Sequence, residues 1–245
     1  PPVTASLVAR MPEVDTVLES ALRHGEFAWG KRRAEATRVK TGRYDQAIVL
    51  QRSAKAALVP WLAGIPQRTG VRGEMRYGLI NDVRTLDTAR YPLKAEHYAL
   101  LGLAGDGDAL APIAYPRLAV DTDNQAALTA RFGLDLSRPI VGFAPGAAYG
   151  PAKAWPASHF AELAARLDDD GWACWIFGSA ADRELADAMK TAAPRHGVDF
   201  AERTRLTDVV DLAALATHFV GNDTGIMHLA SAAAPSVIGL YGSTD

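Results

Sequence analysis

Short apolar runs alternate with helix-forming segments along the chain, most clearly in its second half. The apolar runs predict strands, and the longer segments between them have the apolar spacing of helices. Near-continuous apolar strands that alternate with helices are typical of a parallel sheet covered on both faces. The strands are expected at residues 140–144, 172–177, 219–220 and 237–241, and the helices at residues 156–167, 181–192, 209–217 and 225–234.

The first half shows the same alternation less regularly. A strand is expected at residues 47–50 and helices at 54–63, 95–103 and 124–132, whereas the region 72–86 has no clear period. The first strand and helix of this half form one β-then-α unit.

A break in the pattern near residues 136–139 predicts a domain boundary. The chain has 245 residues, which is enough for two domains of ordinary size. We therefore expect an α/β protein of two doubly wound parallel-sheet domains, one over residues 1–136 and one over residues 137–245.

The composition argues against several classes of protein. No apolar run approaches the roughly 20 residues that a membrane-spanning helix needs. The net charge of −2 argues against a general nucleic-acid binder. The single cysteine, Cys174, forbids an intramolecular disulfide and leaves no cluster for structural zinc. Because no targeting sequence is recognisable, we expect a cytoplasmic protein.

The net charge of the whole chain is close to zero, but the first half contains a basic segment. Between Arg23 and Lys94 the sequence has 15 basic residues against 6 acidic ones. Such an excess suits either a solvated surface or a patch for an anionic ligand, and the sequence leaves both interpretations open.

Three turns rich in small residues follow predicted strands of the second half, at residues 145–153, 222–225 and 242–244. The carboxyl ends of parallel strands meet at one edge of a sheet, where ligands bind in such folds. Backbone N–H groups in these turns suit a diphosphate, and Lys153 adds a positive charge. The alternatives are ordinary connections, with a surface lysine in the first turn and a helix N-cap in the second.

An acid follows a fourth strand. Glu184 comes shortly after the strand at residues 172–177, where it could accept hydrogen bonds from ribose hydroxyl groups or only favour a helix start. The glycine fingerprint of dinucleotide-binding folds and the P-loop signature are both missing from the sequence, which argues against a nicotinamide-dependent dehydrogenase.

Several segments together resemble the bacterial lipopolysaccharide heptosyltransferases, which form glycosyltransferase family 9. In the second half these are PGAAYGPAKAWP at 145–156, GNDTGIMHLA at 221–230 and LYGST at 240–244. The first half has YDQAIVL at 44–50 and AGIPQRTGVRGEMRYGLIND at 63–82, which resembles the branch that adds the second heptose of the inner core. The resemblance implies the GT-B fold of two Rossmann-like domains, both of them incomplete in this sequence.

The resemblance implies an inverting, metal-independent enzyme without a cofactor, which moves a heptose from ADP-L-glycero-D-manno-heptose to the first heptose of the inner core. Domain 137–245 would bind the donor, and Lys153 would stabilise the charge on the departing ADP. The family's general base, an Asp in a Gly-Asp turn after its first strand, has no counterpart in this sequence. The expected donor residues are Gly146, Ala147, Ala148, Lys153, Glu184, Asp223, Thr224, Gly225 and His228.

Domain 1–136 would bind the acceptor, a phosphorylated and carboxylate-bearing lipid A–Kdo–heptose. Forked guanidinium groups suit both of these anions. The sequence departs from the family pattern at Gln51-Arg52, where Pro-Asn is expected, and at Ala154, where a basic residue is expected. The protein would be cytoplasmic, either free or peripheral to the inner face of the inner membrane, without a nucleic-acid partner. The expected acceptor residues are Lys55, Arg68, Arg72 and Arg76.

Two alternative functions also fit the sequence. One is another heptosyltransferase of the same family, adding the first or a later heptose, although residues 70–82 argue against it. The other is a non-catalytic module that binds a nucleotide sugar.

Overall fold

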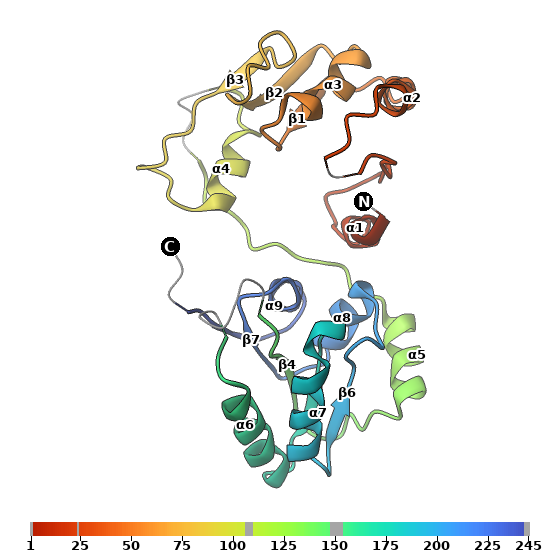
Figure 1. The fold of residues 1–245 in the computed structure, drawn as a ribbon, viewed down its shortest axis with the longest axis vertical. Helices are drawn as coiled ribbons and strands as arrows, with labels where there is room; N and C mark the ends of the chain where they lie inside the picture. The colour runs from red at the N-terminus through yellow and green to blue at the C-terminus, as the bar shows by residue number, and fades with distance from the viewer. Residues whose placement is uncertain (1, 24, 106–109, 148–153, 243–245) are drawn as a thin grey trace. The chain divides into compact units, whose positions relative to one another are not determined.

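The computed structural model describes residues 2–23, 25–105, 110–147 and 154–242. It divides into two compact units, one comprising Pro1–Pro2 and Leu18–Tyr115 and the other Val3–Val17 and Pro116–Asp245. Each unit has its own parallel sheet with helices packed on it (Figure 1). None of the helices in the described ranges is long and apolar enough to cross a membrane.

The second unit contains five parallel strands in the order β6-β5-β4-β7-β8. β4 is the middle strand, and its Phe143 lies beside Ile176 of β5 and Val220 of β7. In chain order the elements are α1 (Pro2–Val8), α5 (Thr122–Phe132), β4 (Ile140–Ala144), α6 (Ala157–Asp169), β5 (Ala173–Ile176), the 3-10 turn η2 (Ala180–Asp182), α7 (Arg183–Ala192), β6 (Gly197–Asp199), α8 (Leu206–Ala213), β7 (His218–Asn222), α9 (Gly225–Ser231) and β8 (Val237–Leu240).

This sheet separates two hydrophobic cores. Successive side chains of a strand point to opposite faces, so Val141 and Phe143 enter one core and Ile140 and Ala144 enter the other. Helices α6 and α7 cover the first core, and α5, α8 and α9 cover the second (Figure 1). The doubly wound arrangement predicted for the second half is therefore confirmed.

The first unit is built on a three-stranded parallel sheet in the order β1-β2-β3. Its cores are small: Ala36, Ala63 and Ile65 are buried in one of them. The strands β2 and β3 were not predicted from the sequence. The elements are α2 (Trp29–Lys40), β1 (Gln46–Val49), α3 (Ala54–Leu62), β2 (Gln67–Val71), β3 (Asp82–Arg84) and α4 (Lys94–Leu100).

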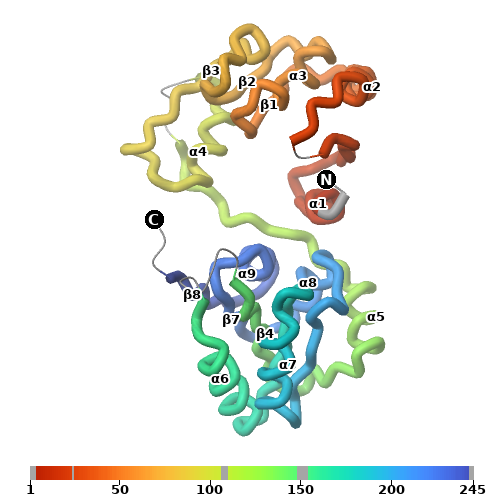
Figure 2. The backbone as a smooth tube through the Cα atoms, viewed as in Figure 1, coloured from red at the N-terminus to blue at the C-terminus, as the bar shows by residue number. Residues whose placement is uncertain are grey.

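The division between the units differs from the expected boundary at residues 136–137. The chain leaves the first unit at Tyr115 and enters the second at Pro116, ahead of α5 (Figure 2). Helix α5 belongs to the second unit because Leu128 and the following Leu134 are buried in the core of its sheet. The interruption that the sequence shows near residue 136 is thus a connection within one unit.

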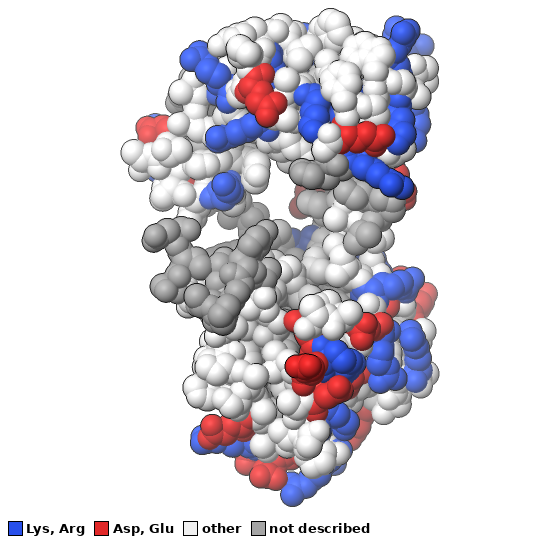
Figure 3. Space-filling model, in the orientation of Figure 1, with Lys and Arg blue, Asp and Glu red and all other residues white. Residues whose placement is uncertain are grey.

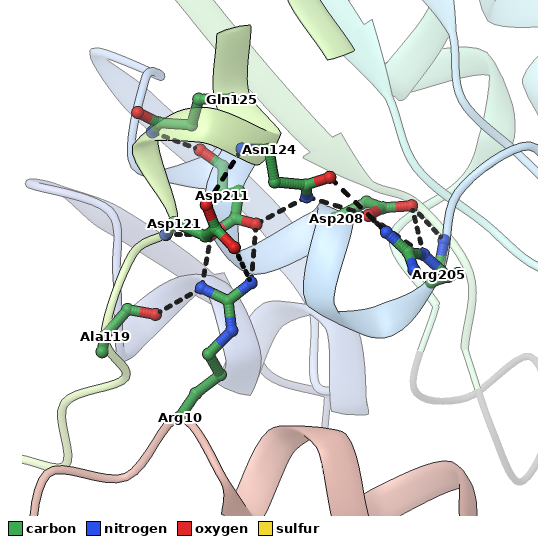
Figure 4. A network of polar contacts seen from close by, with 8 residues as sticks. All are labelled: Arg10, Ala119, Asp121, Asn124, Gln125, Arg205, Asp208 and Asp211. Carbon is green, nitrogen blue, oxygen red and sulfur yellow. Dashed lines mark hydrogen bonds and ion pairs between the residues drawn. The ribbon is translucent and has the colours of Figure 1, made fainter. Parts of the chain in front are cut away.

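A buried polar network joins α8 to the start of α5 (Figure 4). The carboxylate of Asp211 is fully buried and accepts hydrogen bonds from the backbone N–H of Asp121 at 2.8 Å and from Asn124 Nδ2 at 2.7 Å. Arg10 donates to both of its oxygens at 3.2 and 3.1 Å. The network therefore holds three chain segments of the second unit together.

The ionisation of Asp208 in this network makes the free energy of unfolding depend on pH. It accepts hydrogen bonds from Arg205 N and Nη2 at 2.9 and 2.8 Å and from Asn124 Nδ2 at 3.0 Å. Burial raises the pKa of Asp208, but the hydrogen bonds from Arg205 and Asn124 outweigh burial and hold the pKa below its usual range. The charged Asp208 carboxylate therefore stabilises the folded state. This stabilisation is complete above the ordinary aspartate pKa of about 4 and is lost as the pH falls through the lower folded-state pKa.

We expect Asp208→Asn to lower the free energy of unfolding by about 1–2 kcal/mol at pH 7, because a charged acceptor of buried hydrogen bonds is lost. Urea unfolding at pH 7 and pH 3 checks this, and the difference from wild type should shrink at pH 3. The control is Asp169→Asn, whose side chain is 70% exposed in its pair with Arg195. An equal loss for Asp208→Asn at both pH values would contradict the assignment.

Candidate functional site

The direction in which the chain adds strands to the second sheet reverses at its middle strand. From β4 it continues through β5 to β6 on one side, and then returns to β7 and β8 on the other. Such a reversal opens a crevice at the carboxyl ends of the two central strands. β4 and β7 are neighbours, with Ala144 beside Gly221, so the turns that follow them lie side by side.

Asn222 connects these two turns. Its side chain is fully buried at the end of β7. Its Oδ1 accepts a hydrogen bond from Trp155 N at 3.0 Å, and its Nδ2 donates to the carbonyl of Pro145 at 2.7 Å. One side chain thus holds both described ends of the segment between β4 and α6. The sequence analysis missed this role, although a polar Asn at the end of an apolar strand was a signal for it.

Two cavities flank the turn after β4. One, of about 500 Å³, lies between this turn and the start of α9, and its wall is mainly apolar. The other, of about 580 Å³, lies between the turn and helices α6 and α7. Both are lined by Gly146, Ala147, Ala181 and Asp182. The apolar residues of the first cavity include Ala144, Phe177, Leu206, Ile226 and Leu229.

Asp182 is the acid that borders both cavities. Its carboxylate accepts hydrogen bonds from Ser179 N and Oγ, each at 2.8 Å. A Cβ on Gly146 would lie 2.5 Å from Asp182 Oδ1, so a larger residue at this position would displace the Asp182 carboxylate. Glu184, which the sequence suggested for ribose, is exposed in the first turn of α7 and lines neither cavity.

The turn after β7 leads directly into α9. Thr224 is its N-cap and accepts a hydrogen bond from Met227 N at 3.4 Å, so the capping interpretation is confirmed. Thr224 and Gly225 also line the first cavity. His228, on the first turn of the helix, lies 3.0 Å from Asp223 Oδ1 through its Nε2 and is 60% exposed on its side chain. The structure therefore brings the expected Thr224 and Gly225 together with Gly146 and Ala147.

Two other expected donor residues, Ala148 and Lys153, lie outside the described residues, and their roles stay predictions. Metal independence also stays a prediction. In the described part of the chain, no three or more His, Cys, Asp or Glu side chains gather in a way that could hold a metal ion.

In the first unit, two of the three arginines selected from the sequence, Arg68 and Arg76, have backbone partners. Arg68 donates from Nε to the carbonyl of Leu79 at 2.7 Å and from Nη1 to that of Ile65 at 2.5 Å. Of the other expected acceptor residues, Lys55 is half-buried on α3 and Arg72 is exposed. Arg68 thus holds the loop between β2 and β3 in place.

Arg76 belongs to the same loop and is buried, with 3% of its surface exposed. Its Nη1 donates to the carbonyl of Gln51 at 2.6 Å, and its Nη2 donates to that of Val71. Burial and the nearby positive charge of Arg52 lower the pKa of Arg76, and Glu74 partly offsets them. The structure gives Arg76 a contact that organises the loop, and its acceptor role stays a prediction.

Comparison with known proteins gives one consistent family. The sequence model of glycosyltransferase family 9 (heptosyltransferase) matches residues 32–245. The chain is 42% identical over 248 residues to lipopolysaccharide heptosyltransferase 2 of Escherichia coli K12, covering 98% of this chain and 71% of that protein. It is 40% identical over 255 residues to lipooligosaccharide heptosyltransferase 2 of Haemophilus influenzae, covering 98% and 72%.

Solved structures also resemble this chain. The structure of E. coli ADP-heptose lps heptosyltransferase II superimposes with a TM-score of 0.86 at 39% identity, covering all of this chain and 75% of that one. E. coli heptosyltransferase WaaC with ADP-2-deoxy-2-fluoro heptose has a TM-score of 0.70 at 23% identity, which shows a similar fold. The α/β fold class expected from the sequence, with two Rossmann-like units of the GT-B type, is confirmed by the first of these likenesses.

Proposed function

The chain belongs to glycosyltransferase family 9, the heptosyltransferases, and we propose that it transfers a heptose from ADP-L-glycero-D-manno-heptose to the first heptose of the lipopolysaccharide inner core. Relatives about 40% identical over almost the whole chain are named lipopolysaccharide or lipooligosaccharide heptosyltransferase 2, which supports this choice within the family. A cytoplasmic location, free or peripheral to the inner membrane, is part of the proposal.

The crevice of the second unit is the observation that carries the donor assignment. Its mainly apolar cavity of about 500 Å³ has the size and character of a site for a flat base. The cavity borders Gly146 and Ala147 on one side and Thr224 and Gly225 on the other. Backbone N–H groups of such small residues suit the diphosphate of ADP.

In the proposed reaction, the acceptor hydroxyl oxygen forms a bond to C1 of the heptose. The bond between C1 and the β-phosphate oxygen breaks, and ADP leaves with the electron pair. A single displacement of this kind inverts the configuration at C1. The acceptor proton passes to a general base, to which we assign no residue of this sequence. Lys153 would offset the charge that develops on ADP, and His228 would donate a hydrogen bond to the phosphates.

The position of Asp182 leads to a prediction about the ribose. We expect Asp182→Asn to weaken ADP binding about five- to tenfold, because the charged acceptor at the cavity wall becomes a neutral amide. Glu184→Gln should change ADP affinity less than twofold, because Glu184 lines neither cavity. Calorimetric titration with ADP checks both variants, and the reverse ranking would restore Glu184 as the ribose residue.

A transfer assay tests the function itself. The protein is incubated with ADP-heptose and an acceptor ending in one heptose, and the products are followed by mass spectrometry. We expect the acceptor to gain one heptose as one equivalent of ADP is released. Transfer only to an acceptor without heptose, or only to one with two, would assign another reaction of the family. ADP binding without transfer would support a non-catalytic module.

A further inference from the structure

The first unit contains a cavity that the sequence analysis did not identify. It has a volume of about 450 Å³ and lies where the chain leaves β1 and β2, with Leu50 and Val71 in its wall. Arg52 reaches it from the turn before α3, and Lys94 and His97 reach it from α4. Lys94 and His97 are three residues apart and therefore lie on one face of that helix.

Among the residues that the structure describes, Arg52 and Lys94 at this cavity have no carboxylate partner. Arg52 and Lys94 are exposed, and neither side chain makes a hydrogen bond or ion pair with any residue that the structure describes. Glu74 accepts a hydrogen bond from Ala54 N at 3.0 Å, and Glu96 accepts one from Leu93 N at 2.8 Å, so each of these acids holds a backbone N–H group. Positive charge gathered at a concave wall attracts anions.

Two further observations point to an anionic ligand. Arg76 Nη1 donates to the carbonyl of Gln51, the neighbour of Arg52, at 2.6 Å, and the charge of Arg52 contributes to the lowered pKa of Arg76. The ring of His97 donates from Nε2 to the carbonyl of Tyr91 at 2.8 Å, which fixes the orientation of the ring in the cavity wall. On the face drawn in Figure 3, Lys and Arg outnumber Asp and Glu over the first unit, whereas both signs are mixed over the second.

We propose that Arg52 and Lys94 form a subsite for an anionic group of the acceptor saccharide, either a phosphate monoester or a carboxylate, in the cavity whose wall includes His97. This inference rests on the proposed function, because that function assigns the donor to the second unit and leaves the acceptor to the first. A cavity of 450 Å³ has room for a sugar that carries such a group. Arg68 and Arg76, in contrast, already bond to backbone carbonyls.

Steady-state kinetics of Arg52→Ala and Lys94→Ala test the subsite. We expect each variant to raise the KM for the acceptor about tenfold, because a charge-assisted contact with the anion is lost. The kcat and the ADP affinity should stay within twofold of wild type. The matched control is Arg33→Ala, which removes an exposed arginine of α2 outside the cavity and should leave the KM unchanged.

Modified acceptors identify the anion. If the subsite binds phosphate, the effect of both variants should disappear with a dephosphorylated acceptor, and if it binds a carboxylate, with a carboxyl-reduced acceptor. A KM within twofold of wild type for both variants would overturn the proposal. So would equal losses on an acceptor stripped of both anions.

Hydrogen exchange distinguishes failure of the subsite from failure of the function. The intact acceptor should slow amide exchange in residues 50–57 of the wild type and not in the Arg52→Ala/Lys94→Ala double variant. If the wild type transfers no heptose, the proposed function is wrong. The protection of residues 50–57 by the acceptor then still shows whether the subsite binds it. Equal protection in wild type and double variant, or none in either, would refute it.

Discussion

Replacing Asn222 with Ala is expected to lower the free energy of unfolding of the second unit by about 3 kcal/mol and to weaken ADP binding about tenfold. The substitution removes two hydrogen bonds and leaves the N–H of Trp155 and the buried carbonyl of Pro145 without their partner. Each unmet group costs about 1–3 kcal/mol. Because both groups flank the turn after β4, the same change loosens the residues that line the two cavities.

Asn81 offers a matched control for this change. Its side chain accepts from Arg68 N at 2.8 Å and donates to the carbonyl of Pro66 at 2.7 Å, the same pattern of bonds, but it is exposed in the first unit. Asn81→Ala should cost less than about 1 kcal/mol, because water replaces the lost bonds. Hydrogen exchange under increasing urea reports the two units separately. Equal costs for the two variants would show that burial of Asn222 is not what stabilises the turn.

Replacing Lys153 with Ala is expected to lower the rate of heptose transfer about 100- to 1,000-fold. Removing one group that stabilises charge in a transition state typically has this effect. Lys153 lies in the segment between Pro145 and Trp155, whose two ends Asn222 holds at the crevice. The rate should be measured with saturating ADP-heptose, so that weaker binding does not account for the loss.

Two other variants test the reason for the Lys153 effect. Lys153→Arg keeps the positive charge and should recover part of the rate. Lys190→Ala removes a lysine near the end of α7. This end of the helix lies away from the carboxyl edge of the sheet, so the variant should change the rate less than twofold. A transfer rate for Lys153→Ala within threefold of wild type would remove Lys153 from the catalytic assignment.

The elements that the sequence predicted are those with strong local patterns. The runs that form β4, β5 and β8 are apolar and lie close to their predicted bounds. Helix α2 was missed because it is mostly polar, and only Arg32 and Ala36 of it are buried. It therefore lacks the apolar stripe by which a surface helix is recognised.

Strand β2 was missed for a different reason. Its sequence, Gln-Arg-Thr-Gly-Val, has neither an apolar run nor an alternation. It forms a strand because distant partners complete it: the buried Thr69 donates to Asp82 Oδ2 of β3 at 2.7 Å, and Asn81 Oδ1 accepts from Arg68 N at 2.8 Å. Such contacts between residues far apart in the sequence have no local signature.

The sequence by itself determined the alternation of strands and helices and the position of the small-residue turns, because apolar spacing and turn chemistry are local properties. Only the tertiary structure decided which charged side chains border a cavity. Asp182 borders the two cavities of the crevice and Glu184 does not. Arg52 and Lys94 are exposed in a cavity wall, whereas the buried Arg76 bonds to carbonyls. The direction of a side chain depends on the elements packed around it, and long-range contacts set that packing.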